Sequence, residues 1–236
     1  MKIDKKKLEN FWYYYKYYVI AGAFVLFLIL VFIRDKAKSK DYAFFTSFVN
    51  CNVLADTEIF MQAYEDTTSI DKEKEMMYLD TTSITDGYDQ TSLASMERFV
   101  SMVYVGEIDS AIMERDLFTK YGTNGVFMDL RDIFSKEELS SFEGHLYYLD
   151  YALLSTDEEE TEVYSGDITD DTPDTVNHHD PSGMENPVPV GIYLEDGLAD
   201  KVIAANLYSE DSEIIYGILS TKRMPYPKDF LYYLIK

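Results

Sequence analysis

The chain has 236 residues, of which 47% are hydrophobic and 15% aromatic, and its formal net charge is −22. Residues 1–40 hold 9 Lys/Arg and 3 Asp/Glu, a net of +6, which leaves 12 and 40, a net of −28, for residues 41–236. This acidity argues against a nucleic-acid partner, because phosphate binding needs a basic face, and the single cysteine, Cys51, excludes an internal disulfide.

An apolar run lies near the start of the chain. Residues 11–33 begin with clustered Phe, Trp and Tyr and continue with 15 uncharged residues, Val19 to Ile33. The 17 residues from 17 to 33 reach the roughly 17–25 that cross a bilayer, and the aromatic cluster is typical of a membrane interface. The run exceeds the roughly 7–15 apolar residues of a cleavable signal peptide. We therefore predict an uncleaved signal-anchor, in preference to a signal peptide or a buried core helix, with residues 17–33 in the lipid bilayer.

Charge near this run gives the orientation only weakly. Five Lys precede it and four Lys/Arg follow it, so the positive-inside rule does not decide. Residues 34–40 form a basic tether, and residues 41–236 carry too few Lys/Arg to resist export. We predict a single-pass cell-membrane protein with a short cytoplasmic tail, 1–10, and an exported domain, 41–236. Its acidity serves solubility or attracts a cation-rich partner or divalent ions.

The first half of this domain alternates strands and helices. Apolar and aromatic patterning predicts strands at 42–49, 76–79 and 108–113 and helices at 55–64 and 93–103. Such alternation implies parallel strands joined by right-handed crossovers, with the second and third strands on either side of the first.

The second half continues this pattern around an acidic insertion. Ser135 and Glu138 form a capping box, which predicts a short helix. The further expected elements are strands at 146–149, 188–194 and 214–219 and helices at 198–207 and from Pro227 onwards. The sequence thus predicts an α/β fold: a single lobe with a central, mainly parallel sheet flanked by helices, preceded by one transmembrane helix.

Residues 155–187 differ in composition from the rest of the domain. They are rich in Asp, Glu and Pro and poor in apolar side chains, which predicts a long surface loop that buries little. Deleting residues 157–185 is therefore expected to leave the fold intact.

Four short segments carry a resemblance to a known family. They are Gly106–Ile112, Phe127–Leu130, the pair Val190–Ile192 and Ile215–Ile218, and Asp229–Leu234. Together they resemble one lobe of the extracellular solute-binding proteins, over residues 41–150 and 188–236. The resemblance implies a lobe with a cleft edge, but residues 155–187 stand where a second lobe would be inserted. The aromatic run before the span resembles single-pass membrane proteins of Gram-positive bacteria.

Ligands of a doubly wound sheet bind beyond the carboxyl ends of its strands. After the first strand this predicts Asn50 and Asn52 as ligand-binding residues, and after the third strand Arg115 and Asp116. Arg115 can pair with a ligand carboxylate or phosphate; the alternative is a local pair with Asp116 or another acid.

Other chemistry is sparse. His178, His179 and Asp180 are candidate metal ligands, although their spacing matches no zinc or calcium motif and adjacent histidines in a polar loop are often merely solvated. No phosphate loop, nucleophile elbow or His-Glu-x-x-His occurs. We expect a non-catalytic extracytoplasmic binding or assembly module, without a cofactor, whose partner is a membrane or cell-surface protein. The alternative is a reduced solute or peptide receptor.

Overall fold

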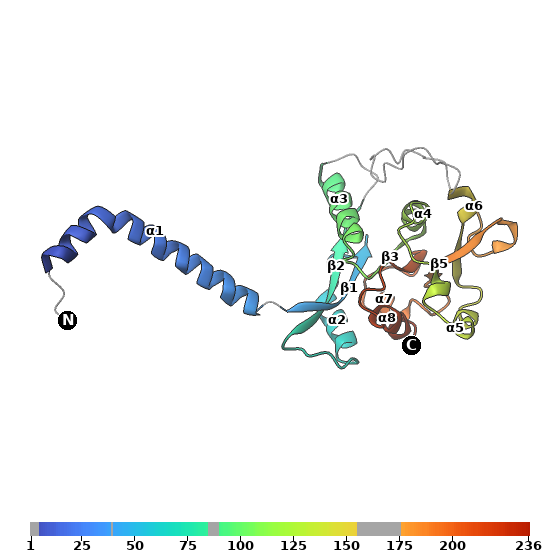
Figure 1. Ribbon diagram of the computed structural model, residues 1–236. Coiled ribbons are helices and arrows are strands. Elements are labelled where there is room, and N and C mark those ends of the chain that lie inside the picture. The colour runs from blue at the N-terminus through green and yellow to red at the C-terminus, as the bar shows by residue number, and fades with distance from the viewer. Residues whose placement is uncertain (1–4, 39, 85–89, 155–175) are drawn as a thin grey trace. The chain divides into compact units, whose positions relative to one another are not determined.

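The computed structural model describes residues 5–38, 40–84, 90–154 and 176–236 (Figure 1). The chain divides into two compact units, Met1–Asp41 and Tyr42–Lys236, which we describe separately.

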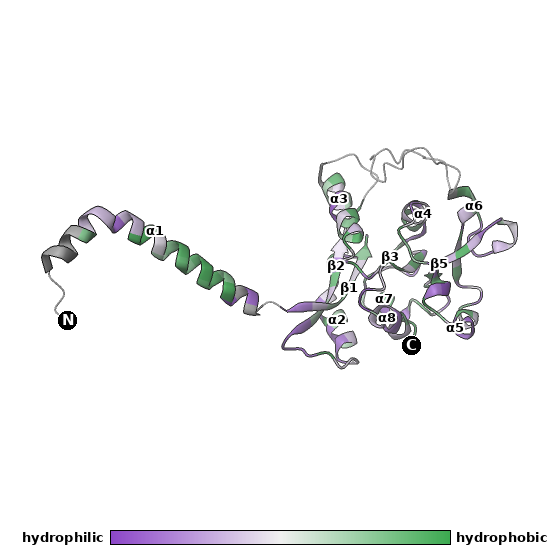
Figure 2. Cartoon of the chain, viewed as in Figure 1, coloured by the Kyte–Doolittle hydropathy of each residue, from purple (hydrophilic) through white to green (hydrophobic). Residues whose placement is uncertain are grey.

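The first unit is built on one long helix, α1 (Lys5–Lys38). Among the described residues only its segment Phe11–Arg34 is long and apolar enough to span a membrane, and none of that apolar stretch is buried. Figure 2 shows the hydrophobic residues as a continuous block in the C-terminal part of α1. At about 1.5 Å per residue, its 24 residues reach about 36 Å, enough for a hydrocarbon layer of about 30 Å.

The second unit is an α/β domain around one six-stranded sheet, in the order β2-β1-β3-β6-β5-β4. Its strands are β1 (Asp41–Val49), β2 (Glu75–Thr82), β3 (Ser110–Glu114), β4 (Leu146–Asp150), β5 (Pro187–Tyr193) and β6 (Ile214–Ile218). Its α-helices are α2 (Thr57–Glu65), α3 (Gln90–Tyr104), α4 (Arg115–Thr123), α5 (Lys136–Ser141), α6 (Tyr151–Leu154), α7 (Asp200–Ala204) and α8 (Tyr226–Leu234), with 3₁₀ turns η1 (Leu130–Asp132) and η2 (Pro181–Gly183).

The sheet is mixed, so the expected mainly parallel sheet is not confirmed. β1 and β3 run parallel, and β2 and β3 flank β1 as predicted. β6, however, runs antiparallel to both β3 and β5, and β5 antiparallel to β4. Antiparallel neighbours need no helical crossover over the sheet. The helix predicted at 198–207, between β5 and β6, is present only as the five-residue α7. The alternation of strands and helices therefore predicts more parallel strand pairs than the sheet contains.

Helices cover both faces of the sheet (Figure 1). On β1, Phe44 and Phe48 pack in one core cluster with residues of α2, α7 and α8, while Phe45 and Val49 pack in a second cluster with residues of α3 and α4. Coverage on both sides explains why β1 reads as a continuous apolar run.

The antiparallel half of the sheet contains a pair of glycines. Gly191 on β5 lies opposite Gly217 on β6. A Cβ on Gly217 would stand 2.5 Å from Phe127 and 2.7 Å from Phe118, whose rings stack with centroids 3.9 Å apart. The glycines thus leave the space that the two stacked rings occupy.

The acidic insertion is only partly described. Residues 155–175 lie outside the described residues, but residues 176–186 pack against the domain: Tyr148 of β4 donates its N–H to the His178 carbonyl, and Tyr151 donates to Asn186. His178 itself is buried. Most of residues 176–186 are exposed, but hydrogen bonds of their backbone hold this end of the segment to edge strand β4. The proposed deletion of residues 157–185 would remove the contact between His178 and Tyr148.

Candidate functional site

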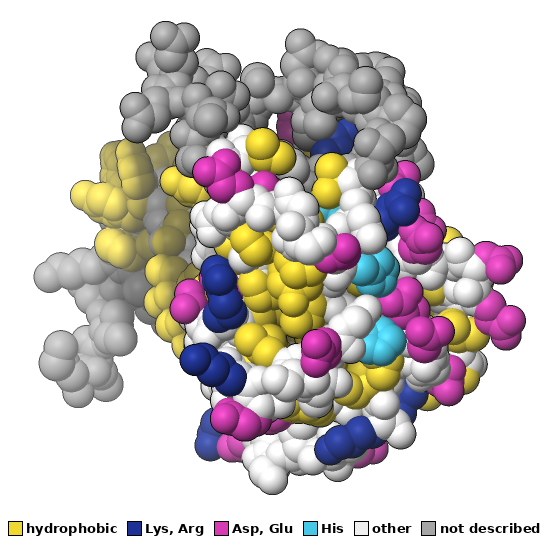
Figure 3. Space-filling view, turned by 90° about the vertical axis from the view of Figure 1, so that its right-hand side faces the viewer, with side chains coloured by type: hydrophobic (Ala, Val, Ile, Leu, Met, Phe, Trp, Pro, Cys, Tyr) yellow, Lys and Arg dark blue, Asp and Glu magenta, His cyan; other side chains and the backbone are white. Residues whose placement is uncertain are grey.

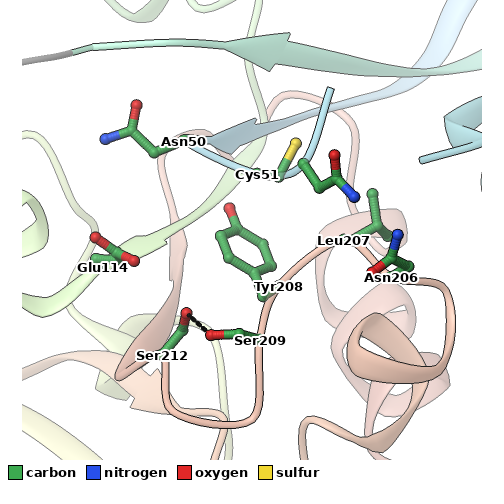
Figure 4. A pocket seen from close by; sticks show the side chains of 9 residues that line it. Asn50, Cys51, Glu114, Asn206, Leu207, Tyr208, Ser209 and Ser212 are labelled. Carbon is green, nitrogen blue, oxygen red and sulfur yellow. Dashed lines mark hydrogen bonds between the residues drawn. The ribbon is translucent and has the colours of Figure 1, made fainter. Parts of the chain in front are cut away.

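A polar crevice lies where the parallel strands β1 and β3 end. It has a volume of about 370 Å³ and is lined by Asn50, Cys51, Asn52, Glu114, Asn206, Leu207, Tyr208, Ser209 and Ser212. Figure 4 shows the chain after β1 facing the 206–212 segment across it, with Glu114 to one side. Because β2 and β3 lie on opposite sides of β1, the strand order reverses between β1 and β3, and ligands usually bind at this point in such folds.

Asn50 serves the fold at this point. Its backbone adopts the left-handed conformation, with φ of 58°, which asparagine tolerates better than most residues. Its side-chain Nδ2 donates to the Ile84 carbonyl at 2.8 Å, and its Oδ1 accepts from the Ile84 N–H at 2.7 Å. The amide therefore ties the end of β1 to the chain that follows β2.

Asn52 has a similar local role. Its Oδ1 accepts the N–H of Leu54 at 3.0 Å, and its own N–H donates to the Leu207 carbonyl at 2.8 Å. The side chain shapes the turn, while the backbone holds the two walls of the crevice together.

Tyr208 is the largest side chain that lines the crevice. Its hydroxyl lies 2.8 Å from the Val49 carbonyl and 3.0 Å from the Ile112 carbonyl, so it links the end of β1 to the middle of β3. Burial raises the pKa of this phenol well above its ordinary value.

Cys51 lies beside Tyr208 and is also buried. Burial raises the pKa of its thiol to about 11, so it is a neutral thiol near pH 7. Catalytic cysteines have lowered pKa values in electropositive surroundings, and Cys51 has the opposite environment.

Arg115 and Asp116 lie outside the crevice lining. Arg115 Nη2 contacts Asp116 Oδ1 at 3.2 Å, and Nη1 contacts Glu213 Oε2 at 3.1 Å. Arg115 is therefore paired with local acids, the alternative noted above. Of the four predicted ligand-binding residues, the fold brings Asn50 and Asn52 into the crevice and leaves Arg115 and Asp116 beside it.

The three consecutive metal candidates separate in the fold. The His178 ring stacks on Tyr147, and its Nδ1 lies 2.7 Å from the Tyr148 carbonyl. The His179 ring instead stacks on Tyr193. Asp180 accepts the N–H of Ser182 at 2.9 Å and caps the turn η2. These residues therefore do not converge as one site.

A buried ion pair escaped the sequence analysis. Asp109 is fully buried just before β3, where it accepts the N–H of Phe45 at 2.9 Å. Arg223 Nη1 lies 3.1 Å from both Asp109 carboxylate oxygens. The two residues are 114 positions apart, and no local pattern announces the pair. Burial raises the pKa of Asp109, an effect opposed by the Phe45 N–H and by Arg223.

Comparison of the chain with protein-family models, curated proteins and solved structures finds no match. Any functional assignment therefore rests on the geometry described above.

Proposed function

We propose that the protein is a single-pass, membrane-anchored module whose α/β domain lies outside the cell, where it binds or assembles with a membrane or surface protein. The observation that carries this proposal is the 24-residue segment Phe11–Arg34 in α1, which is apolar, entirely unburied and attached to a separate compact unit. A helix that exposes an apolar surface on every side needs lipid around it.

The charge distribution supports export of the domain, because residues 41–236 carry only 12 Lys/Arg. The net charge is +6 for residues 1–40 and −28 for residues 41–236. The domain is repelled by anionic lipid, whereas the basic residues near the span are attracted to it. The acidic domain is therefore not expected to bind anionic lipid, which leaves its surface to a protein partner.

The crevice supports a binding role more than a catalytic one. Asn50 and Asn52 direct side-chain hydrogen bonds to the backbone, and Tyr208 does the same. These contacts stiffen the walls, and Cys51 is held as a neutral thiol.

The anchor is tested by disrupting the span. Replacing Leu26 and Leu28 with Arg places two charges in the apolar stretch, each costing about 2.5–3.5 kcal/mol of insertion. The full chain carrying both changes should leave the carbonate-washed membrane fraction. The matched control replaces Val53 and Leu54, two exposed apolar residues of the domain, with Arg, and should stay in the membrane. Release of both variants, or of neither, contradicts the anchor.

The orientation is tested by protease treatment of intact cells whose wall has been removed. A C-terminal epitope on the unaltered chain should be digested without lysis. Protection of the epitope until lysis would place the domain inside the cell and overturn the exported module.

The second candidate function is a reduced solute or peptide receptor, which the position of the crevice favours. Such a receptor should gain thermal stability from a screened metabolite or peptide. Glu114→Gln, which changes the crevice lining, should abolish that gain, while Arg115→Ala, next to it but outside the lining, should not. An assembly module should instead yield a crosslinked membrane partner and no stabilising small ligand.

A further inference from the structure

A cluster of cation-ligating side chains lies at the other end of the sheet order, where β4 begins and β5 ends. His145, Glu195 and Asp196 each offer a ligand atom, and these atoms all lie within 4.8 Å of one another. In Figure 3, histidine side chains on this side of the domain lie among Asp and Glu side chains. The three residues belong to neither the crevice nor the His178–Asp180 segment.

Backbone pairing brings these residues together. His145 immediately precedes β4, and its carbonyl accepts the N–H of Tyr193, the last residue of β5, at 2.8 Å. Glu195 and Asp196 follow β5, and Leu194 is held by a hydrogen bond to the Ile214 carbonyl. Asp196 has a φ of 51° and begins the turn. The strand ends therefore fix the positions from which the three side chains extend.

The imidazole of His145 carries the argument. Its Nδ1 is buried and makes no hydrogen bond within the described part of the chain. Glu195 Oε1 lies 3.5 Å from this nitrogen, and the two atoms do not form a hydrogen bond. A buried polar atom without a partner is costly, and a bound cation would satisfy it.

The separation fits two ligands of one metal ion. A tetrahedral zinc ion with nitrogen and oxygen ligands at about 2.1 Å places neighbouring ligand atoms about 3.4 Å apart. The 3.5 Å between His145 Nδ1 and Glu195 Oε1 matches that edge. A cation between the two atoms would give Nδ1 the partner that the protein does not provide.

His179 supports the same carboxylate. Its ring stacks on Tyr193 with centroids 3.8 Å apart. Its Nδ1 lies 3.2 Å from the Gly144 carbonyl and 3.7 Å from Glu195 Oε1. A ring held in this way lies beside Glu195 without being a ligand and limits where that carboxylate can move, as the groups around metal ligands do in other sites.

The geometry points to a binding site for a divalent transition-metal ion of the zinc class, with His145, Glu195 and Asp196 as ligands, His179 as a positioning residue and solvent at the open position. Two carboxylates balance the charge of the ion. An imidazole ligand favours zinc, cobalt or nickel over calcium and magnesium, which prefer oxygen ligands only.

The test uses the full chain in detergent, stripped of metal with a chelator. Titration with Zn²⁺ should show one ion per chain and a rise in melting temperature, because an ion that binds only the folded state stabilises it. Co²⁺ should give a visible absorption band of a low-symmetry site. If Zn²⁺ does not raise the melting temperature, the proposal is overturned. Equal rises with Zn²⁺, Ca²⁺ and Mg²⁺ also overturn it, because they indicate diffuse binding to acidic groups.

Substitutions locate the ion. His145→Gln and Asp196→Asn should each abolish the Co²⁺ band, and His179→Ala should weaken Zn²⁺ binding about 10–100-fold. The matched control is Asp180→Asn, which changes a carboxylate beside His179 outside the cluster and should bind like the parent. Comparing melting temperatures in chelator shows whether His145→Gln still folds; if it does not, Asp196→Asn, on an exposed residue, decides.

Normal binding by Asp196→Asn, or loss of binding in Asp180→Asn, overturns the assignment. The outcome is independent of the proposed anchor and partner, because the site lies wholly in the domain and its readouts involve neither.

Discussion

Two carboxylates, one beside strand β3 and one on helix α5, show how burial alters the same kind of ion pair. In the parallel half, Asp109 is fully buried and its pKa is raised, because burial outweighs the Phe45 N–H and Arg223. Glu138 of α5, in contrast, is partly exposed and pairs with Lys228 of α8 at 2.7 Å. Lys228 and the Ser135 N–H lower the pKa of Glu138 from its ordinary 4.5 to about 2.

The buried pair and the partly exposed pair should differ in how much they stabilise the fold. A buried pair needs each partner, since a lone buried charge is strongly unfavourable. A partly exposed pair is screened by solvent and contributes little. We therefore expect the fold to depend on the pair of Asp109 and Arg223 more than on the pair of Glu138 and Lys228, and we expect packing to limit stability around Gly217. The following changes test this contrast.

Arg223→Ala should have the largest effect. It leaves Asp109 buried without its cation and also removes the donor to the Glu107 carbonyl. Breaking one partner of a buried pair costs about 3 kcal/mol or more. Chemical denaturation of the full chain in detergent measures this loss.

Arg131→Ala is the matched control, because Arg131 pairs with Asp129 at the surface. Its effect should stay within about 1 kcal/mol.

The loss in Arg223→Ala should also depend on pH. Removing Arg223 takes away a contact that lowers the pKa of Asp109, so the folded-state pKa rises further. Protonated Asp109 then stabilises the folded variant. This contribution is complete below the ordinary pKa of about 3.9 and is lost as the pH rises through the folded-state pKa. The difference between variant and parent should thus shrink on acidification; a loss that is independent of pH would contradict the charge argument.

Gly217→Ala tests packing in the antiparallel half. The added Cβ would stand 2.5 Å from a Phe127 ring atom and 2.7 Å from Phe118. Overpacking of this kind costs about 1–3 kcal/mol, measured by the same denaturation.

Gly183→Ala serves as the control for Gly217→Ala, because nothing lies within 4 Å of its added Cβ. Equal stabilities of the two variants would show that the rings move aside, and that packing around the glycine pair does not limit this half of the sheet.

How much the sequence predicted depended on whether the signal was local. The capping box of Ser135 and Glu138 is confirmed in both directions, because its residues are three apart. The α/β class, the flanking helices and the apolar N-terminal helix are likewise present. The patterns that predict them lie within single elements.

Features set by distant contacts were missed. Strand direction after β3 depends on which edge the returning chain reaches, and hydrophobic patterning does not encode this. The polar sequence around His178 predicts a solvated loop residue, whereas its contact with edge strand β4 buries it. His145 and Glu195 meet only through the pairing of β4 with β5, so the cluster they form with Asp196 had no sequence signature.

Glu138→Gln should have the smallest effect and the clearest dependence on pH. Glutamine preserves the capping box with Ser135 but removes the charge that Lys228 contacts. Since the folded-state pKa of Glu138 is lowered, the pair contributes stability above pH 4.5, and this contribution is lost as the pH falls towards 2. The variant should be slightly less stable than the parent at neutral pH and should converge with it in acid, in a series of denaturation curves across that range. Glu137→Gln, on an exposed neighbour in the same turn, should follow the parent throughout. The convergence runs in the same direction as for Arg223→Ala but starts from a much smaller gap, and a gap as large as that of Arg223→Ala would show that partial exposure does not weaken the pair.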